Sequence, residues 1–405
     1  MDYLWKIAYQ NAQKAEALYE RYMTDGASVM LPFEIRPLHG ERAFPLFYRA
    51  SNGMLLQMER IYRADERLRT LAGQLPQVAR EDFLSNLIIE ELYTTNEIER
   101  VQSTRAEIAD SVRHVQTGGG GSAVRFTSMI QSYLALAEGK FTLPETLADI
   151  RRIYDAITEG EIAPEDRPDG RWFRQGAEDV SNAVGRVIHQ GVMPEARIEE
   201  WMQTLLRFMA EGDVPALIQV AVAHYVFAYV HPFYDGNGRT GRFLSSLYLS
   251  EICSEFTAYS LSQGCRMQQK LYYEIFDRTN KHNSFGEMNT FIDGFLQIVA
   301  DGQEKIYEDL ADRSAQLDAA ARRIDADARA DSDLKCEILY VLEQKRLFAS
   351  EDQGMDRRQL TDIVLAHTSD VKRAQINRAY DTLEAAGCIA RIKGKPIVYR
   401  SMLAE

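Results

Sequence analysis

The sequence predicts a mainly helical protein, and three observations support this fold class. Most segments of the 405-residue chain repeat apolar residues at three- and four-residue intervals, as in "FLSNLIIEELY" and "RIEEWMQTLLRFMA". Strand signals are few, and the clearest is residues 179–192, where short β-branched runs flank Asn and Gly as in a hairpin. A hydrophobic fraction of 45% is enough to bury a sizeable core.

We expect four parts along the chain. Residues 1–116 form an N-terminal helical region, and residues 117–300 form a core domain that begins with the connector "TGGGGS" at 117–122. Residues 301–332 are rich in charged residues and predict a connecting helix. Residues 333–405 form a C-terminal module.

The connecting helix carries a thin apolar seam, because Leu310, Leu317 and Ile324 fall seven residues apart. The pattern fits a solvated helix, with a coiled-coil homodimer contact as the alternative.

Composition excludes several classes of protein. A net charge of -13 argues against general binding to nucleic acid or to a membrane surface. The four cysteines lie far apart without a CxxC pair, which is typical of free thiols in a reducing compartment. The longest apolar run, residues 214–230, contains Pro215, Gln219 and His224, so it suits a buried helix better than a membrane span. Without a signal peptide at its start, the chain is expected to be cytoplasmic, with no membrane partner.

The densest cluster of charge and glycine is "HPFYDGNGRTGR" at 231–242. Pro232 ends a buried helix just after His231, and the chain turns through residues 236–238 before a second helix begins. Unpaired N–H groups and the positive end of the helix dipole make such a helix start an anion site. The alternative is an ordinary glycine-rich turn, but eight fixed residues in this order make a chance match improbable.

The side chains of this cluster have the chemistry of phosphoryl or nucleotidyl transfer. Arg239 and Arg242 lie on one face of the first helical turn and can hold phosphate oxygens. Asp235 offers a hard oxygen ligand suited to Mg²⁺, and His231 has the pKa range of a general base.

This stretch resembles the signature of the Fic family, HPFx[D/E]GNGRxxR, at every defined position. The preceding "HYVFAYVHPF" also resembles the lead-in helix of that family, and the resemblance covers about residues 85–300. It implies a Fic-type helical core and a protein adenylyltransferase, which transfers AMP from ATP to a Ser, Thr or Tyr hydroxyl of a target protein.

The resemblance also implies a role for each residue of the motif. His231 deprotonates the target hydroxyl, and Asp235 holds Mg²⁺ on the ATP phosphates. The residues of the anion hole and the arginines that hold the γ- and β-phosphates are Gly236, Asn237, Gly238, Arg239 and Arg242.

Gly238 bears on the donor, because a phosphotransferase branch of the family has Lys at this position. The resemblance therefore favours a nucleotide donor, with UMP or phosphocholine transfer as alternatives. Removal of AMP from a target, with a water positioned by Glu99, is a further alternative.

The segment "TTNEIER" at 94–100 resembles the inhibitory motif [S/T]xxxE[G/N] of regulated Fic proteins through Thr95 and Glu99. The i, i+4 spacing places both side chains on one helix face. The resemblance implies self-inhibition by an N-terminal helix, in which Glu99 pairs with Arg239 and blocks the γ-phosphate. Arg100 stands where Gly or Asn is usual, and an exposed Glu on a polar helix is the alternative.

Two further segments resemble binding elements of the family. The hairpin signal is similar to the flap that pairs with the target backbone, and the candidate flap residues are Arg186, Val187, Ile188 and His189. In "YYEIFDRTN", the resemblance implies that Tyr273 stacks on adenine and Asn280 bonds to the base, with core packing as the alternative for the tyrosine.

The C-terminal module resembles a winged helix. Three helical stretches precede the basic segment "CIARIKGKPIVYR". A DNA-binding regulator whose Fic domain senses nucleotide is therefore a competing function. We favour a protein-docking or dimerisation module, because the helix before the wing mixes acidic with basic residues. The expected partner is a target protein, with self-modification as a second route.

Overall fold

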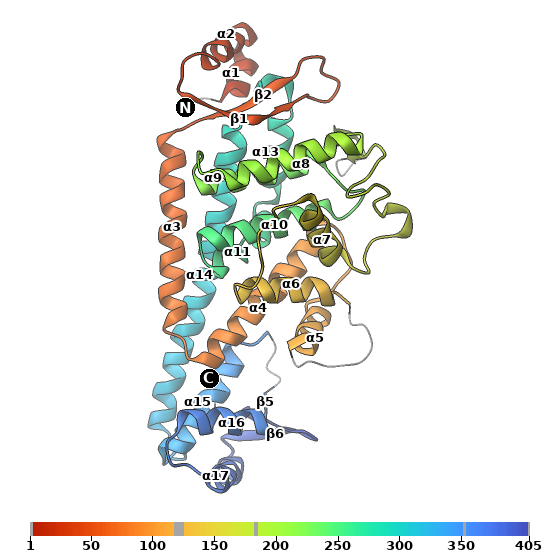
Figure 1. Cartoon of the computed structure of the whole chain (residues 1–405). Helices are drawn as coiled ribbons and strands as arrows, with labels where there is room; N and C mark the ends of the chain where they lie inside the picture. The colour runs from red at the N-terminus through yellow and green to blue at the C-terminus, as the bar shows by residue number, and fades with distance from the viewer. Residues whose placement is uncertain (1–2, 117–124, 182–184, 351–353, 404–405) are drawn as a thin grey trace. The chain divides into compact units, whose positions relative to one another are not determined.

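A computed structural model describes residues 3–116, 125–181, 185–350 and 354–403. The chain is mainly helical, as the sequence predicts (Figure 1). The connector at 117–122 lies outside the described residues. None of the helices in the described part of the chain is long and apolar enough to cross a membrane.

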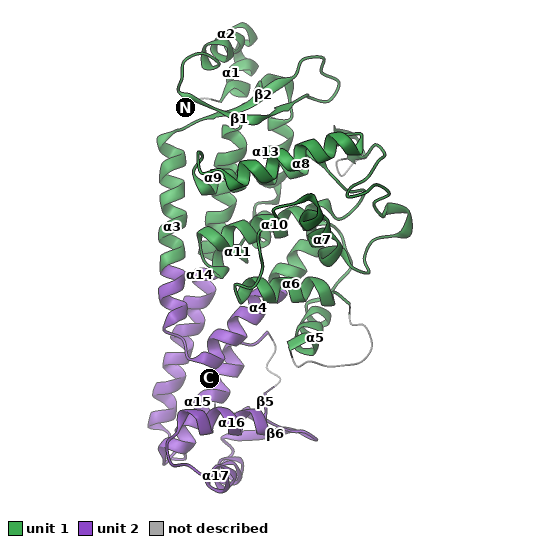
Figure 2. Ribbon diagram, viewed as in Figure 1, with its two compact units in different colours: residues 1–66, 90–305 green, residues 67–89, 306–405 purple. Residues whose placement is uncertain are grey.

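Contacts between residues divide the chain into two compact units (Figure 2). The first comprises residues 1–66 and 90–305, and the second comprises residues 67–89 and 306–405. The division falls within three helices, which are α3 (Asn52–Gly73), α4 (Gln77–Ile98) and α14 (Asn289–Ala326).

The first unit is helical with two small hairpins. Its other helices are α1 (Leu4–Gln10), α2 (Ala12–Tyr22), α5 (Arg105–Gln116), α6 (Thr127–Ala137), α7 (Leu147–Thr158), α8 (Glu195–Ala210), α9 (Ala216–Val230), α10 (Asn237–Ile252), α11 (Glu255–Ala258), α12 (Leu261–Met267) and α13 (Gln269–Thr279). Its strands are β1 (Ser28–Ile35) with β2 (Phe44–Arg49), and β3 (Asp179–Ser181) with β4 (Val187–Gln190). Each pair is antiparallel.

The hairpin predicted at 179–192 is present as β3 and β4, with Val180 opposite His189. The β1–β2 hairpin was not predicted. Its first strand buries Leu31, Phe33 and Ile35 at alternate positions, but Pro32 interrupts the strand signal, as it does in edge strands.

Helix α9 is the centre of the first unit. Nearly every residue from Leu217 to Val230 is buried, and a helix that is apolar on all sides belongs inside a domain. It packs against α8 and α10, and α10 also packs against α7. Because α9 ends at Val230, the motif that begins at His231 emerges from the middle of this core.

The second unit contains the C-terminal module. Its further elements are α15 (Asp333–Phe348), β5 (Met355–Asp356), α16 (Arg357–His367), α17 (Arg373–Ala385), β6 (Ile389–Gly394) and β7 (Ile397–Ser401). The strands form an antiparallel sheet in the order β5-β7-β6. The three predicted helices and the final hairpin are therefore present, and their interpretation as a winged helix stays a prediction.

The apolar seam of α14 is buried within the chain. Leu310, Leu317 and Ile324 are each at most 2% exposed, and Ile324 belongs to the core of the second unit. The seam is therefore neither solvated nor an open surface for a coiled-coil partner.

Candidate active site

The first residue of the motif has an unusual backbone conformation. His231 caps the C-terminus of α9 with φ 52° and ψ 61°, in the left-handed region. A non-glycine residue in this region costs about 1–2 kcal/mol, so its surroundings must hold it there.

The loop after His231 is held by the motif's asparagine. Asn237 Oδ1 accepts a hydrogen bond from Phe233 N at 3.0 Å, and its Nδ2 donates to Phe233 O at 2.7 Å. The Phe233 ring stacks on Tyr154 with centroids 3.6 Å apart. The Asn237 side chain therefore shapes the loop, which leaves its backbone N–H for an anion.

The start of α10 has the geometry of an anion site. Gly236 has φ 81°, and a Cβ atom there would lie 2.6 Å from Thr158 Cγ2, so only glycine fits. Thr240 N donates the first helical hydrogen bond, to Gly236 O. The amides of residues 237–239 consequently have no partner within the helix and lie at its positive end.

Arg239 is buried and has no hydrogen-bond partner among the residues that the structure describes. It is 1% exposed, and none of its three guanidinium nitrogens makes a hydrogen bond. Asp235 Oδ2 lies 3.5 Å from its Nη2, which is an ion-pair contact. Buried polar groups are nearly always satisfied, so this guanidinium indicates a place for an anion.

Arg242, in contrast, is held by the predicted inhibitory motif. Glu99 Oε1 lies 2.8 Å from its Nη1. Thr95 accepts from Nε through Oγ1 at 2.9 Å and from Nη2 through its carbonyl at 3.1 Å. Burial opposes the charge of the guanidinium, but the Glu99 carboxylate outweighs it and raises the pKa of Arg242 above its ordinary value.

The predicted partner of Glu99 was therefore wrong, because Glu99 pairs with Arg242 and not with Arg239. Thr95 and Glu99 lie on the same face of the helix end, and one planar guanidinium offers enough N–H groups to bind both. Arg239 lies one turn earlier on α10, beside Asp235.

The Glu99 carboxylate also lies against the anion loop. A Cβ atom at Gly238 would lie 1.9 Å from Glu99 Oε1, so glycine is required there while Glu99 occupies this position. Asp235 has the opposite environment, because its side chain is 48% exposed. Its Oδ1 accepts from Gly236 N at 2.5 Å.

The turn that ends α4 sets the backbone conformation of Arg100. Arg100 N donates to Glu97 O at 3.1 Å and Val101 N donates to Asn96 O at 2.9 Å, which is the Schellman pattern. This pattern needs a left-handed residue after the cap, where Gly and Asn are favoured. Arg100 takes that conformation with φ 59°.

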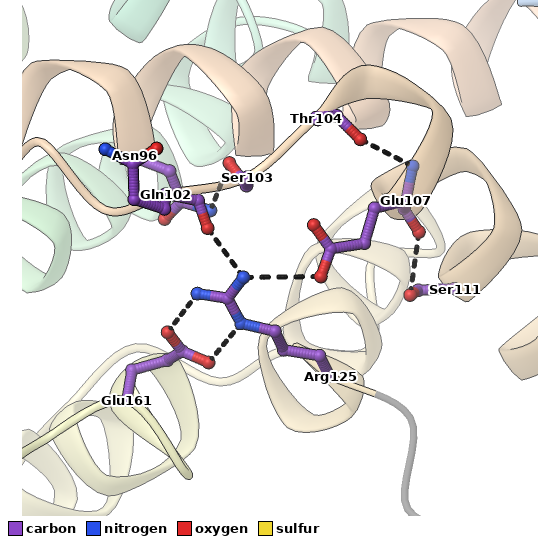
Figure 3. A network of polar contacts seen from close by, with 8 residues as sticks. All are labelled: Asn96, Gln102, Ser103, Thr104, Glu107, Ser111, Arg125 and Glu161. Carbon is purple, nitrogen blue, oxygen red and sulfur yellow. Dashed lines mark hydrogen bonds and ion pairs between the residues drawn. The ribbon is translucent and has the colours of Figure 1, made fainter.

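A polar network holds the segment that follows α4 (Figure 3). Arg125 binds both carboxylate oxygens of Glu161, at 2.8 and 2.7 Å. Its Nη1 donates to Gln102 O at 2.6 Å and to Glu107 Oε1 at 3.3 Å. The segment that leaves α4 is thereby fixed to the segment after α7, and nothing in the sequence pattern pointed to Arg125.

His231 is held in its neutral form. Although the residue keeps partial exposure, burial of the ring lowers the pKa of the imidazole to about 3, and the nearby His189 and Arg174 side chains act in the same direction. A neutral imidazole can accept a proton, as a general base must.

The candidate flap residues occupy β4 and the position before it. His189 is buried, its Nε2 lies 2.5 Å from Tyr229 O, and burial lowers its pKa. Val187 and Ile188 are half-buried, and Arg186 directly precedes the strand.

The two candidate adenine-binding residues lie on and after α13. Tyr273 is 51% exposed, so it is not a core residue. Its ring lies 5.6 Å from that of Tyr272. Asn280 follows the helix, and its Oδ1 accepts from the Tyr225 hydroxyl at 2.7 Å.

Glu91 is a residue that the sequence analysis missed. It is 0% exposed, and it accepts hydrogen bonds from Ser262 N at 3.1 Å and from the Ser262 hydroxyl. Burial raises the pKa of its carboxyl to about 7. Its spacing of four and eight residues before Thr95 and Glu99 places it on the same face of α4.

Comparisons with known proteins find one matching family model and several similar solved structures. Residues 144–249 match the sequence model described as the Fic/DOC family. A solved Fic family protein from Desulfovibrio desulfuricans G20 has a TM-score of 0.53 at 18% identity, covering 88% of this chain and 98% of its own, which shows a shared fold. A Fic domain containing signaling protein from Bacteroides thetaiotaomicron VPI-5482 has a TM-score of 0.42 at 16% identity, covering 62% of this chain and 94% of its own. Fic-1 from C. elegans has a TM-score of 0.42 at 18% identity, covering 65% of this chain and 74% of its own. The residues that match the Fic/DOC family model include the whole 231–242 motif.

Proposed function

We propose that the protein is an adenylyltransferase that transfers AMP from ATP to a hydroxyl side chain of a target protein and is restrained by Glu99. Fic domain proteins commonly transfer a nucleoside monophosphate onto proteins, which supports the general class. The observation that carries the proposal is Arg239, a buried guanidinium that makes no hydrogen bond within the described residues and that belongs to the first turn of α10, where the amides of residues 237–239 have no partner within the helix. Phosphate oxygens would satisfy both at once.

A magnesium ion fits this arrangement. Mg²⁺ keeps several waters and is usually bound by one or two carboxylates together with substrate phosphates. Asp235 offers such a carboxylate, exposed and next to the anion loop. When bound, the ion would neutralise phosphate charge.

The reaction uses the neutral imidazole of His231. The target hydroxyl oxygen forms a bond to the α-phosphorus, and the bond from that phosphorus to the bridging oxygen breaks. His231 accepts the hydroxyl proton, and pyrophosphate leaves. In this proposal the edge of β4 holds the backbone of the target, while Tyr273 and Asn280 hold adenine.

Restraint by Glu99 follows from its charge and position. Its carboxylate occupies Arg242 and lies against Gly238, where the phosphates would bind. A triphosphate at this place would meet a negative charge and would lack one of its two arginines. ATP would therefore bind in a productive pose only when Glu99 moves away.

The test is transfer of label from ATP to protein in a whole lysate and in the purified chain. We expect label from [α-³²P]ATP with Glu99→Gly, weaker label with the wild type, and none with Glu99→Gly/His231→Ala. Label from [γ-³²P]ATP would instead indicate phosphotransfer, and label from UTP alone would indicate UMP transfer. Absence of protein labelling by Glu99→Gly with every donor would contradict the proposal. Release of AMP from an already modified target would support the reverse reaction.

For the C-terminal module we propose protein docking. Two of its basic residues are already paired with acids on the same surface, since Arg373 Nη2 lies 2.6 Å from Asp362 and Arg391 Nη2 lies 3.0 Å from Glu384. An arginine that already forms an ion pair contributes less to binding the phosphates of DNA, so DNA is the less favoured partner. Salt-dependent retention of genomic DNA by the full chain in a filter-binding assay would overturn this choice.

A further inference from the structure

Arg174 is a fully buried arginine whose partners are backbone carbonyls of the candidate active site. It is 0% exposed. Its Nε donates to His231 O at 2.8 Å, and its Nη2 donates to Val230 O at 3.3 Å and to Val192 O at 2.9 Å. Its backbone N donates to Pro232 O at 3.1 Å.

These bonds act on the end of α9. Val230 and His231 supply carbonyls at the helix C-terminus, where a cation is favoured by the helix dipole. They also fix the peptide groups on both sides of His231, which has the strained left-handed conformation. Arg174 is therefore placed to maintain that conformation.

The same guanidinium joins His231 to the candidate flap. Val192 lies two residues beyond β4, and its N donates to Val230 O at 3.0 Å. A Cβ atom at Gly191 would lie 2.2 Å from Arg174 Nη2 and 3.1 Å from His231 Cβ. The chain leaving β4 thus passes so close to the arginine that any side chain at position 191 would have to displace the guanidinium.

We propose that Arg174 is a positioning residue, which holds His231 at the end of α9 and fixes its distance from the strand that would present the acceptor. This inference rests on the proposed function for its kinetic consequence. None of the hydrogen bonds described above for the Arg174 side chain reaches Arg239 or the start of α10. Its replacement should therefore lower the rate of transfer without changing the affinity for nucleotide.

The experiment compares turnover with nucleotide affinity in the activated Glu99→Gly background. We expect Arg174→Gln to lower kcat by about 10- to 100-fold, because small misplacement of a catalytic group has effects of this size. The Kd for Mg·ATP, measured by calorimetry, should stay within about twofold. Arg174→Lys should recover part of kcat, because an ammonium group can still reach some of the carbonyls.

Glu195→Ala is the matched control, because it loosens the same loop without touching His231. The Glu195 carboxylate accepts from the backbone N–H groups of residues 171, 172 and 173, at 3.0, 2.7 and 2.9 Å. We expect its kcat to stay within about threefold of the background enzyme. An equal loss of kcat in Glu195→Ala and Arg174→Gln would overturn the proposal, since the arginine would then act only through the loop.

Gly191→Ala tests the same idea without replacing the arginine itself. Its new methyl group would displace the Arg174 guanidinium and should give the same loss of kcat at unchanged Kd. If Arg174→Gln does not fold, this variant decides, and full kcat in Gly191→Ala would overturn the proposal.

Failure of the proposed function would be distinguishable, because the Glu99→Gly enzyme would then show no transfer at all. In that case hydrogen exchange of the 227–236 peptide tests the arginine alone. Faster exchange in Arg174→Gln and not in Glu195→Ala would support the positioning role, and equal exchange would overturn it.

Discussion

Arg239 and Arg242 lie one turn apart on α10, are equally buried and differ in their partners. Arg242 binds Glu99 and Thr95, whereas Arg239 makes no hydrogen bond in the described part of the chain. The sequence alone predicted that both arginines lie on one face of the first helical turn. It could not show which of them Glu99 reaches, because that choice depends on how α4 packs against α10.

At the residue scale, Asp235 gives the simplest prediction. Asp235→Ala should weaken Mg²⁺-dependent ATP binding by about tenfold or more and should lower the melting temperature only modestly, because the exposed carboxylate contributes little packing and its contact with Arg239 is long, at 3.5 Å. Calorimetry of ATP binding with Mg²⁺ and with EDTA measures the first effect, and thermal unfolding measures the second. An ATP affinity with the same metal dependence as wild type would exclude Asp235 as a metal ligand.

Glu99→Gly should raise transfer by about one to two powers of ten. A partly buried, charge-assisted pair such as Glu99–Arg242 is worth about 1–3 kcal/mol, and its loss should raise the ATP-competent fraction accordingly. Initial rates of labelling and the Kd for ATP measure the effect. Glu97→Gln is the matched control, because Glu97 lies on the same helix but pairs with Arg266 at an exposed site. Equal rates for wild type and Glu99→Gly, or an equal rise in Glu97→Gln, would refute restraint by this pair.

At the element scale, the turn that ends α4 sets the position of Glu99. Arg100→Gly should relieve the left-handed strain and stabilise this turn by about 0.5–1 kcal/mol. Because the turn carries Glu99, basal transfer should fall by about two- to fivefold, the opposite of the effect of Glu99→Gly. Labelling rates in the wild-type background measure the change. A higher rate in Arg100→Gly would mean that the arginine side chain itself supports the inhibited state.

An element could be predicted when the pattern that indicates it lies within one short segment of the sequence. The helices and the 231–242 loop were predicted because spacing and glycine positions are properties of short segments. The β1–β2 hairpin was missed because Pro32 weakens its pattern. Three charged residues were missed, namely Arg174, Arg125 and Glu91. The sequence pattern around a charged residue is the same whether its side chain binds backbone groups inside the protein or lies exposed at the surface.

At the scale of the whole chain, the compact units do not follow the order of the sequence. The second unit joins residues 67–89 with residues 306–405. Its core contains Val78 together with residues of α15, α16 and α17. A boundary read from composition shifts marks one position on the chain, so it cannot describe a unit made of two distant stretches.

The stability of the first unit should depend on pH through two buried carboxyls. Burial raises the pKa of Glu91 and of Glu287 to about 7 each. Both groups bind a proton more tightly in the folded chain than in the unfolded chain, where the pKa is near 4.5. The stability that they contribute is therefore fully present below about pH 4.5 and is lost as the pH rises through about 7.

Wild-type protein should accordingly unfold at lower urea concentration at pH 8 than at pH 6, and Glu91→Gln should show a smaller difference between the two. A neutral amide keeps the shape of the protonated carboxyl and can accept from Ser262 N, as Glu91 does. Over the whole range from about pH 4.5 to 7, the upper limit for Glu91 is about 3 kcal/mol, from a pKa difference of about 2.5 at 1.36 kcal/mol for each unit, and about 1.4 kcal/mol of it is lost between pH 6 and pH 8.

Because Glu91, Thr95 and Glu99 share one face of α4, loss of the Glu91 proton should also loosen the inhibitory contact. Basal labelling by wild type should then rise more steeply between pH 6 and pH 8 than labelling by Glu91→Gln. Parallel pH profiles for the two proteins, in both unfolding and labelling, would show that Glu91 does not titrate in this range.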